Sequence, residues 1–256
     1  MLRVLEPIWT GKPTTADRLR GRIERVLDWA KARGLREGEN PARWRGHLDN
    51  LLAKQTKTKK HYAAMPFEEV PAFLAELRKQ EGVGPRALEI LILTGLRTAE
   101  VLEAKWDEIN LEKREWIIPA ERMKNGKEHK VPLTDRVLEI LGTLPREDGN
   151  PFVFIGAKAG SPFYIKGLFK LMRQLRPGVT THGFRSSFSD WAHEKTNAQT
   201  HIIEMCLAHT VGSAVERAYR RGDLFDKRRA LMEAWEAFCL HPEATGKKVV
   251  PLHGRA

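Results

Sequence analysis

The stretch His201–Arg221, HIIEMCLAHTVGSAVERAYRR, predicts two short helices separated by a break. The first helix is the apolar run over residues 202–208, which ends at His209. Ser213 and Glu216 have the spacing of a capping box, so we expect a second helix to begin there. The stretch therefore predicts a helical fold around a polar turn.

Tyr219 stands on the second of these helices, ten residues after His209 and directly before Arg220 and Arg221. A tyrosine hydroxyl is a nucleophile, a histidine moves protons and arginines bind phosphate, so three residue classes used in phosphoryl transfer meet here. A tyrosine on a short helix is more often a half-buried packing residue. The rest of the chain has to decide between packing and catalysis.

The composition is strongly basic. The 256 residues include 44 Lys and Arg against 33 Asp and Glu, a formal charge of +11, and the pI is about 9.8. With 41% hydrophobic residues, the chain is able to bury a core in one or two domains. The excess charge favours a polyanionic partner such as nucleic acid, although a merely basic soluble protein has the same composition.

Cys206 and Cys239 both lie in apolar helical contexts, which is typical of core residues in a reducing compartment rather than of a disulfide or metal framework. No apolar run reaches the ~18–20 residues of a membrane span, and the N-terminus lacks the apolar region of a signal peptide. The sequence thus predicts a cytoplasmic protein.

Residues 1–53 are expected to form part of a helical domain. After an irregular start, Thr14–Gly34 has apolar residues at helical spacing. Asn40-Pro41 has the pattern of a cap and first helical position, opening the helix PARWRGHLDNLL. Two such helices do not bury both their faces alone, so they belong to a larger domain or pack on the residues C-terminal to them.

Residues 54–64 predict a basic linker, because this stretch is polar and without period. Its lysines either lie on phosphates or are solvated, and both interpretations stay open. Residues 65–240 are expected to form the main domain, and residues 241–256 a flexible tail. The linker lysines are Lys54, Lys57, Lys59 and Lys60.

Arg97 is expected in an elbow between two helices. Pro85–Thr94 is strongly apolar and predicts a central helix, and a new helix follows with Thr98 as N-cap. Next to the free N–H groups of that elbow, Arg97 is well placed to hold a phosphate oxygen. Glu100 either orients Arg97 or forms with it a surface pair worth little.

Residues 116–118 and 129–133 predict two strands, and Asn125-Gly126 between them is a strong hairpin-turn signal. Lys124 stands just before this turn and Lys127 just after it. In one interpretation the hairpin tip delivers an ammonium to a phosphate or leaving group. In the other, both lysines are solvated.

His182 and Arg185, in the sequence HGFR, are three residues apart on one predicted helix face near its N-terminus. Both can therefore meet one anion, although such a pair is usually structural. The preceding helix, SPFYIKGLFKLMRQLRP, is expected to turn inward Leu168, Phe169, Leu171, Met172 and Leu175. The last helix, DLFDKRRALMEAWEAFCL, has an apolar stripe of Leu224, Leu231, Trp235 and Phe238.

Six of these residues occur in the order Arg97, Lys124, His182, Arg185, His209 and Tyr219. They stand in the motifs GLRTAE, MKNGK, HGFR, LAH and AYRR. This ordered set of motifs resembles that of the tyrosine recombinase (phage integrase) family. The phrases NPARW, ERMKNGKEHKVPL and ERAYRRGD look more closely like integrases of prophages and genomic islands of the P4 type. The resemblance covers about residues 1–240.

We expect a mainly α fold with a small antiparallel β-sheet (α+β) at residues 115–133. The resemblance implies a partial core-binding domain over residues 1–53 and a catalytic domain over residues 65–240. It also implies site-specific recombination, which integrates or excises a prophage or genomic island at double-stranded attachment sites. A tetramer on DNA, accessory DNA-bending proteins and a place at the nucleoid are further implications.

Carried onto this sequence, the family mechanism makes Tyr219 the nucleophile, which forms a 3′-phosphotyrosyl link and releases a 5′-hydroxyl. Arg97 and Arg185 would hold the nonbridging oxygens, and His209 would hydrogen-bond the phosphate. The remaining roles are a base or orienting donor for His182, protonation of the leaving oxygen for Lys124, and a supporting acidic position for Glu100. Further DNA contacts are expected from Lys54, Lys57, Lys59, Lys60, Lys127, Arg220 and Arg221.

The chemistry agrees with this resemblance. A tyrosine of pKa ~10 is a poor nucleophile at neutral pH and needs cations that stabilise its phenolate. Two arginines, a lysine and two histidines supply them without a metal. The sequence has no carboxylate cluster of a two-metal nuclease and no Walker-type GxxxxGK[ST]. Since transesterification conserves the bond energy, we expect no metal, ATP or other cofactor.

Two departures from the family pattern stand out. Ala208 replaces the glycine of the commoner Leu-Gly-His form, and we expect this change to be harmless. The expected arm-type domain and the first part of the core-binding domain are missing, so we expect a truncated integrase.

Three other functions stay open: a catalytically silent DNA-binding remnant, a type IB topoisomerase, and a basic helical protein without an active site. The last helix either docks on a neighbouring protomer or packs within its own chain.

Overall fold

The computed structural model describes residues 1–55, 63–212 and 222–241 of the chain. It divides into two compact units, residues 1–61 and 62–256. Across the described residues, no helix has the length and apolar character needed to cross a membrane. The predicted division into core-binding domain, linker, catalytic domain and tail stays a prediction.

The first unit contains helices α1 (Leu2–Trp9) and α2 (Pro13–Ala32) and a 3₁₀ turn at Leu48–Asn50. The expected irregular start is wrong, because residues 2–9 form helix α1. Leu5 and Trp9 of this helix are buried, and the ring of Trp9 stacks on Trp44 at 5.5 Å. A helix this short gains its stability from such packing.

The second helix predicted for this unit is also wrong. The Asn40 amide group donates to the carbonyl of Glu24 at 2.8 Å and to Asp28 at 2.6 Å, and its Oδ1 accepts the N–H of Ala42 at 2.9 Å. Asn40 is therefore buried in a loop that it ties to α2, and the residues after it form turns instead of a helix.

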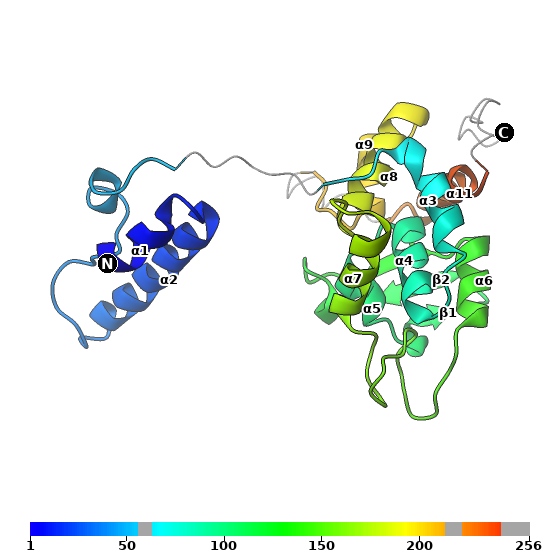
Figure 1. Cartoon of the computed structure of the whole chain (residues 1–256), viewed down its shortest axis with the longest axis horizontal. Coiled ribbons are helices and arrows are strands. Elements are labelled where there is room, and N and C mark those ends of the chain that lie inside the picture. Colours follow the sequence, from blue (N-terminus) through cyan, green and yellow to red (C-terminus); the bar gives the residue numbers. More distant parts are fainter. Residues whose placement is uncertain (56–62, 213–221, 242–256) are drawn as a thin grey trace. The chain divides into compact units, whose positions relative to one another are not determined.

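The second unit is mainly helical with one small sheet, which confirms the predicted fold class. The α-helices among its described residues are α3 (Val70–Leu77), α4 (Val83–Thr94), α5 (Thr98–Leu102), α6 (Asp135–Thr143), α7 (Ile165–Leu175), α8 (Gly183–Lys195), α9 (Thr200–Cys206) and α11 (Phe225–Leu240). Helix α4 lies at the centre and packs against α3, α5, α6, α7, α8 and α11 (Figure 1).

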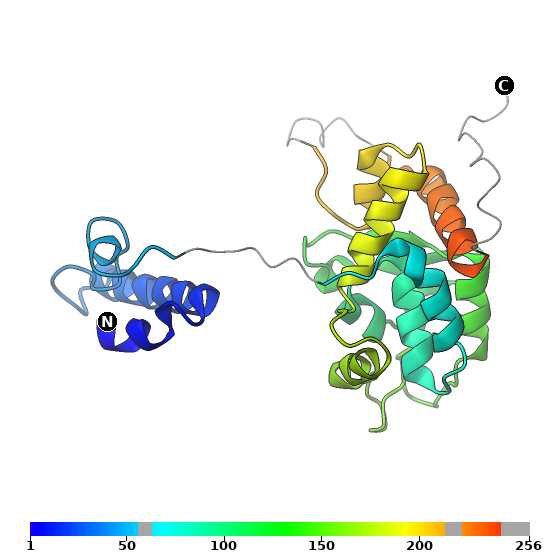
Figure 2. The ribbon, with the colours of Figure 1, turned by 45° about the horizontal axis from the view of Figure 1, so that its top comes forward.

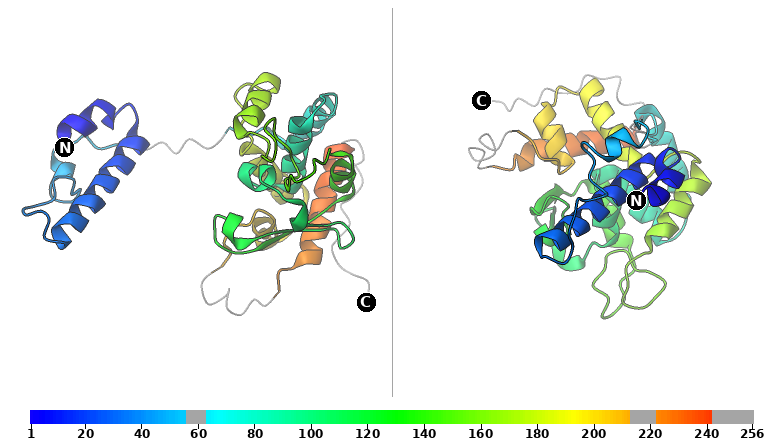
Figure 3. Two further views of the ribbon diagram at one scale, coloured as in Figure 1. Left: turned by 90° about the horizontal axis from the view of Figure 1, so that it is seen from below. Right: turned by 90° about the vertical axis from the view of Figure 1, so that its left-hand side faces the viewer.

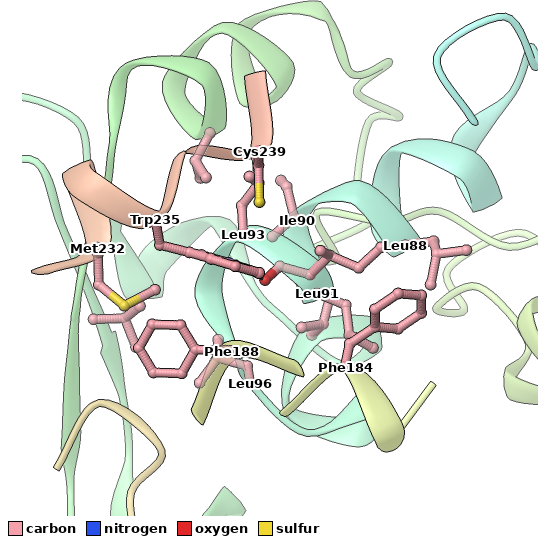
Figure 4. Close-up of a cluster of buried hydrophobic side chains, with 14 of the residues drawn as sticks. Leu88, Ile90, Leu91, Leu93, Leu96, Phe184, Phe188, Met232, Trp235 and Cys239 are labelled. Carbon is pink, nitrogen blue, oxygen red and sulfur yellow. The ribbon is translucent and has the colours of Figure 1, made fainter. Parts of the chain in front are cut away.

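The core surrounds α4 and the inner face of α11. The Trp235 indole N–H donates to the carbonyl of Ile92 at 3.0 Å, and Phe188 and Met232 pack beside it (Figure 4). Helices α8, α9 and α11 lie side by side (Figure 2). The stripe of α11 thus packs within its own unit, and docking of this stripe on a neighbour is wrong.

The sheet has the antiparallel order β1 (Ile109–Asn110), β2 (Glu115–Ile118) and β3 (His129–Pro132). Trp116 pairs with Val131, which confirms the predicted hairpin. Strand β1 was not predicted, because two residues carry no alternation pattern. Strand β3 contacts α11, which lies beside the sheet in the left view of Figure 3.

The turn predicted at Asn125-Gly126 is present, inside a connection longer than a tight hairpin. The connection runs from Pro119 to Glu128, and Gly126 donates its N–H to the carbonyl of Met123 at 3.0 Å with φ of 64°. The Asn-Gly pair therefore closes a turn inside a longer loop. One further prediction is wrong: Phe169 is 40% exposed, although it was expected to face inward.

Candidate active site

Arg97 lies where α4 ends and α5 begins. Gly95 ends α4 in the left-handed region with φ of 64°, and Arg97 then takes the N-cap position of α5. The predicted cap, Thr98, is instead the first helical residue, and its hydroxyl lies 3.0 Å from that of Thr181. The elbow expected from the sequence therefore exists, with Arg97 itself as its capping residue.

Glu100 fixes the side chain of Arg97. Its carboxylate accepts the backbone N–H of Arg97 at 2.8 Å and the Nη1 of Arg97 at 2.6 Å. Glu100 is only 3% exposed, whereas the side chain of Arg97 is 24% exposed. A buried carboxylate thus orients a guanidinium that solvent still reaches, which is more than a surface ion pair.

Arg185 is the most buried cation of the site, at 4% exposure. Among the described residues, its guanidinium donates to the carbonyls of Gly95 and Leu207, the latter at 2.6 Å, and to Nε2 of His209 at 2.9 Å. Burial, followed by the charge of Arg97, lowers the pKa of Arg185 to about 10. A desolvated cation held by neutral acceptors gains from an added anion.

His209 is presented by the turn that ends α9. Ala208 adopts the left-handed region with φ of 51°. Its N–H donates to the carbonyl of Met205 at 3.1 Å, and the N–H of His209 donates to the carbonyl of Glu204 at 2.9 Å. These two bonds form a Schellman motif, a helix C-terminus that usually has glycine at the left-handed position.

His182 is the N-cap of α8, and Arg185 lies one turn into that helix. Partial burial lowers the pKa of His182, and the nearby charges of Arg185, Arg97, His209 and Lys124 lower it further. Four groups from separate segments therefore lie around this imidazole. Its neutral form is favoured at neutral pH, so the ring is suited to accept a proton.

Lys124 is exposed in the loop that joins β2 to β3. The next residue, Asn125, donates from its amide group to the carbonyl of Ala208 at 3.4 Å. At the base of the loop, Arg122 donates to the carbonyl of Glu100 at 2.7 Å. The loop thereby contacts the turn before His209 and the helix that carries Glu100. Lys127 is also exposed in this loop.

Several predicted site residues lie outside the described residues: Tyr219, Arg220, Arg221, Lys57, Lys59 and Lys60. The capping box of Ser213 and Glu216 lies there as well. Lys54 is described and is exposed in the first unit. The structure therefore brings together Arg97, Glu100, Lys124, His182, Arg185 and His209, and their roles stay predictions.

Residues 63–224, more than half of the chain, match the family described as the phage integrase family. The chain belongs to the phage integrase family. Residues 1–47 match the phage integrase central domain. Tyrosine recombinase XerD of Staphylococcus haemolyticus is 29% identical over 152 residues, and tyrosine recombinases are enzymes.

Prophage integrases are among the relatives of this integrase-family chain. Prophage integrase IntZ of Escherichia coli (strain K12) is 32% identical over 225 residues, which cover 86% of the chain and 54% of that relative. The integrase of Enterobacteria phage P4 is 30% identical over 247 residues, covering 88% of the chain and 55% of the relative. The chain thus spans about half the length of the curated relatives it matches.

Solved structures of the family share the fold. The integrase from mycobacterium phage Brujita aligns with a TM-score of 0.54 and 20% identity over 95% of this chain and 79% of that one. A lambda integrase (75–356) dimer bound to a COC′ core site aligns with a TM-score of 0.56 and 18% identity over 78% of this chain and 74% of that one.

Two residues of this integrase-family site were missed by the sequence reasoning. Glu204 bonds to His209, and the signal for it is the spacing of five residues that a Schellman motif brings together. His129 opens β3, and burial, followed by the charge of Arg228, lowers its pKa to about 4. The signal for its burial is strand alternation, which puts His129 on the same face as Val131 and Leu133.

Proposed function

We propose that this chain is a site-specific DNA recombinase that cuts and rejoins DNA through a 3′-phosphotyrosyl intermediate. One observation carries the proposal: Arg97, Lys124, the pair His182 and Arg185, and His209 come from four distant segments and gather around one place. That place has three cationic side chains and two carboxylates, Glu100 and Glu204, so a phosphodiester anion complements it.

In the proposed first step, the hydroxyl oxygen of Tyr219 attacks the scissile phosphorus. Its proton passes to neutral His182, and the bond from phosphorus to the 5′-oxygen breaks. Lys124 gives a proton to that leaving oxygen. Arg97 and Arg185 hold the nonbridging oxygens and stabilise the charge that builds up on them. Rejoining reverses these transfers, with a 5′-hydroxyl of the partner strand as nucleophile.

Double-stranded DNA at an attachment site is the proposed substrate, and integration or excision of a prophage or genomic island is the proposed role. The identities with prophage integrases over most of the chain support this role. Assembly as a tetramer on DNA, accessory DNA-bending proteins and action at the nucleoid in the cytoplasm belong to the same proposal.

Nicked suicide half-sites from the flanks of the element that encodes the chain test this function. The short fragment that carries the released 5′-hydroxyl diffuses away after cleavage, so the covalent protein–DNA adduct accumulates. We expect an adduct that resists denaturation and that is absent with Tyr219→Phe. Salt-sensitive DNA binding without an adduct would instead make the chain a DNA-binding protein without cleavage activity. Relaxation of supercoils without strand exchange would indicate a topoisomerase.

A further inference from the structure

Glu204 contacts His209 through both its backbone and its side chain. The carbonyl of Glu204 accepts the N–H of His209 at 2.9 Å, and its carboxylate Oε2 lies 2.6 Å from Nδ1 of the imidazole. The two side chains are 33% and 41% exposed. The double contact follows from the Schellman motif, which returns the chain over the last turn of α9.

The partner of the second ring nitrogen, Nε2, shows which tautomer of His209 is present. Nε2 of His209 lies 2.9 Å from Nη2 of Arg185. A guanidinium only donates hydrogen bonds, so Nε2 has to accept, and the ring hydrogen of the neutral imidazole resides on Nδ1. That hydrogen points at the carboxylate of Glu204. Carboxylate, imidazole and guanidinium therefore form one directed chain.

This chain bears on the orientation of Arg185. The guanidinium of Arg185 is held by the carbonyls of Gly95 and Leu207 and by His209. With the opposite tautomer, an N–H of the ring would face an N–H of Arg185, and the two groups would repel each other. Whatever fixes the hydrogen on Nδ1 also fixes the direction in which Arg185 presents its remaining N–H groups.

We propose that Glu204 is a positioning residue of the recombination site, which acts through the imidazole of His209 on the guanidinium of Arg185. Glu204 does not touch the reacting atoms. It plays for His209 the part that Glu100 plays for Arg97, so that each side of the phosphate site has its own orienting carboxylate. The proposal rests on the proposed function for its catalytic consequence, but not for the orientation of the ring.

The orientation is tested on the wild-type chain by nitrogen NMR of ¹⁵N-labelled histidine without DNA. The signals of His209 are identified by their loss in His209→Ala. We expect a neutral ring that is protonated on Nδ1, and exchange between both tautomers in Glu204→Ala. A wild-type ring that is protonated on Nε2 would overturn the proposal.

The catalytic consequence is tested by the rate of adduct formation on suicide half-sites. We expect Glu204→Ala to lower the rate about 10-fold or more, a size typical of partners that orient a histidine. Glu204→Gln should retain more activity, because its amide oxygen still accepts the hydrogen of Nδ1. DNA affinity should stay unchanged. The matched control is Glu194→Ala, an exposed glutamate of α8.

A double-mutant cycle separates positioning from a general loss of structure. If Glu204 acts through His209, Glu204→Ala lowers the rate no further in the His209→Ala background. A further loss as large as in the wild type would overturn the proposal. Absence of any adduct from the wild type, combined with a ring protonated on Nδ1, would overturn the proposed function and still support the hold of Glu204 on the ring.

Discussion

Ala208 is a residue under backbone strain next to the site. An L-amino acid with a Cβ pays roughly 1–2 kcal/mol for the left-handed region that Ala208 occupies. The strain is tolerated because the Schellman turn brings His209 to Arg185. We therefore expect alanine at this position to leave the function unchanged and to lower the stability of the fold.

We expect Ala208→Gly to stabilise the chain by up to about 1 kcal/mol. Relief of the strain exceeds the ~0.5–1 kcal/mol that glycine costs through the unfolded state. Urea unfolding measures the change. Ala75→Gly, at an exposed position inside α3, is the matched control and should destabilise by about 1 kcal/mol. Equal losses in both variants would contradict the assignment of strain to Ala208.

His129 makes the stability of the fold depend on pH. Its pKa in the folded chain is about 4, below the ordinary value of 6.5. Between these values the unfolded chain binds more protons than the folded one, so the contribution to stability is present above pH 6.5 and is lost as the pH falls toward 4. From pH 7 to pH 5 the loss amounts to about 2 kcal/mol.

We expect His129→Gln to remove this part of the pH dependence, whatever it does to stability at pH 7. Urea unfolding at pH 5 and pH 7 gives the difference. His193→Gln, an exposed histidine of α8, is the control and should retain the wild-type dependence. An unchanged slope in His129→Gln would show that other groups cause the acid sensitivity.

At the scale of elements, Gly183 lets two segments approach closely. A Cβ on this residue would lie 2.3 Å from the carbonyl oxygen of Ala63 and 2.8 Å from Cα of Ala64, both backbone atoms. The same carbonyl accepts the N–H of Thr180 at 3.0 Å. The glycine of the motif HGFR is therefore required by contact with the chain that enters the second unit.

We expect Gly183→Ala to destabilise the chain by roughly 1–3 kcal/mol, because the added methyl group forces two backbones apart. It should also slow adduct formation, since His182 directly precedes Gly183 at the N-cap position of the same helix. Thermal and urea unfolding measure the first effect. Gly142→Ala is the matched control, because a Cβ on Gly142 of α6 meets nothing within 4 Å, and it should be neutral or stabilising. Equal behaviour of the two variants would rule out the steric explanation.

At the scale of the whole molecule, the sequence predicted what local patterns determine. A strongly apolar run predicted α4, apolar periodicity predicted α8 and α11, and alternation predicted the hairpin of β2 and β3. The loop after Asn40 and the helix α1 were mispredicted, because buried side-chain contacts between distant residues override local preference there. Glu204 and His129 were not predicted as site residues for a related reason. Their contacts and charges involve neighbours that only the fold brings close.

Residues 63–65, near the start of the second unit, are hydrogen-bonded to residues on either side of His182 and Arg185. The carbonyl of Ala63 is bonded to Thr180, and the carbonyl of Met65 accepts the hydroxyl of Ser187 on α8. A pull on this segment would therefore act on residues that flank His182 and Arg185, as well as on the core to which Met65 belongs. The segment that enters the second unit is thus coupled mechanically to the candidate active site.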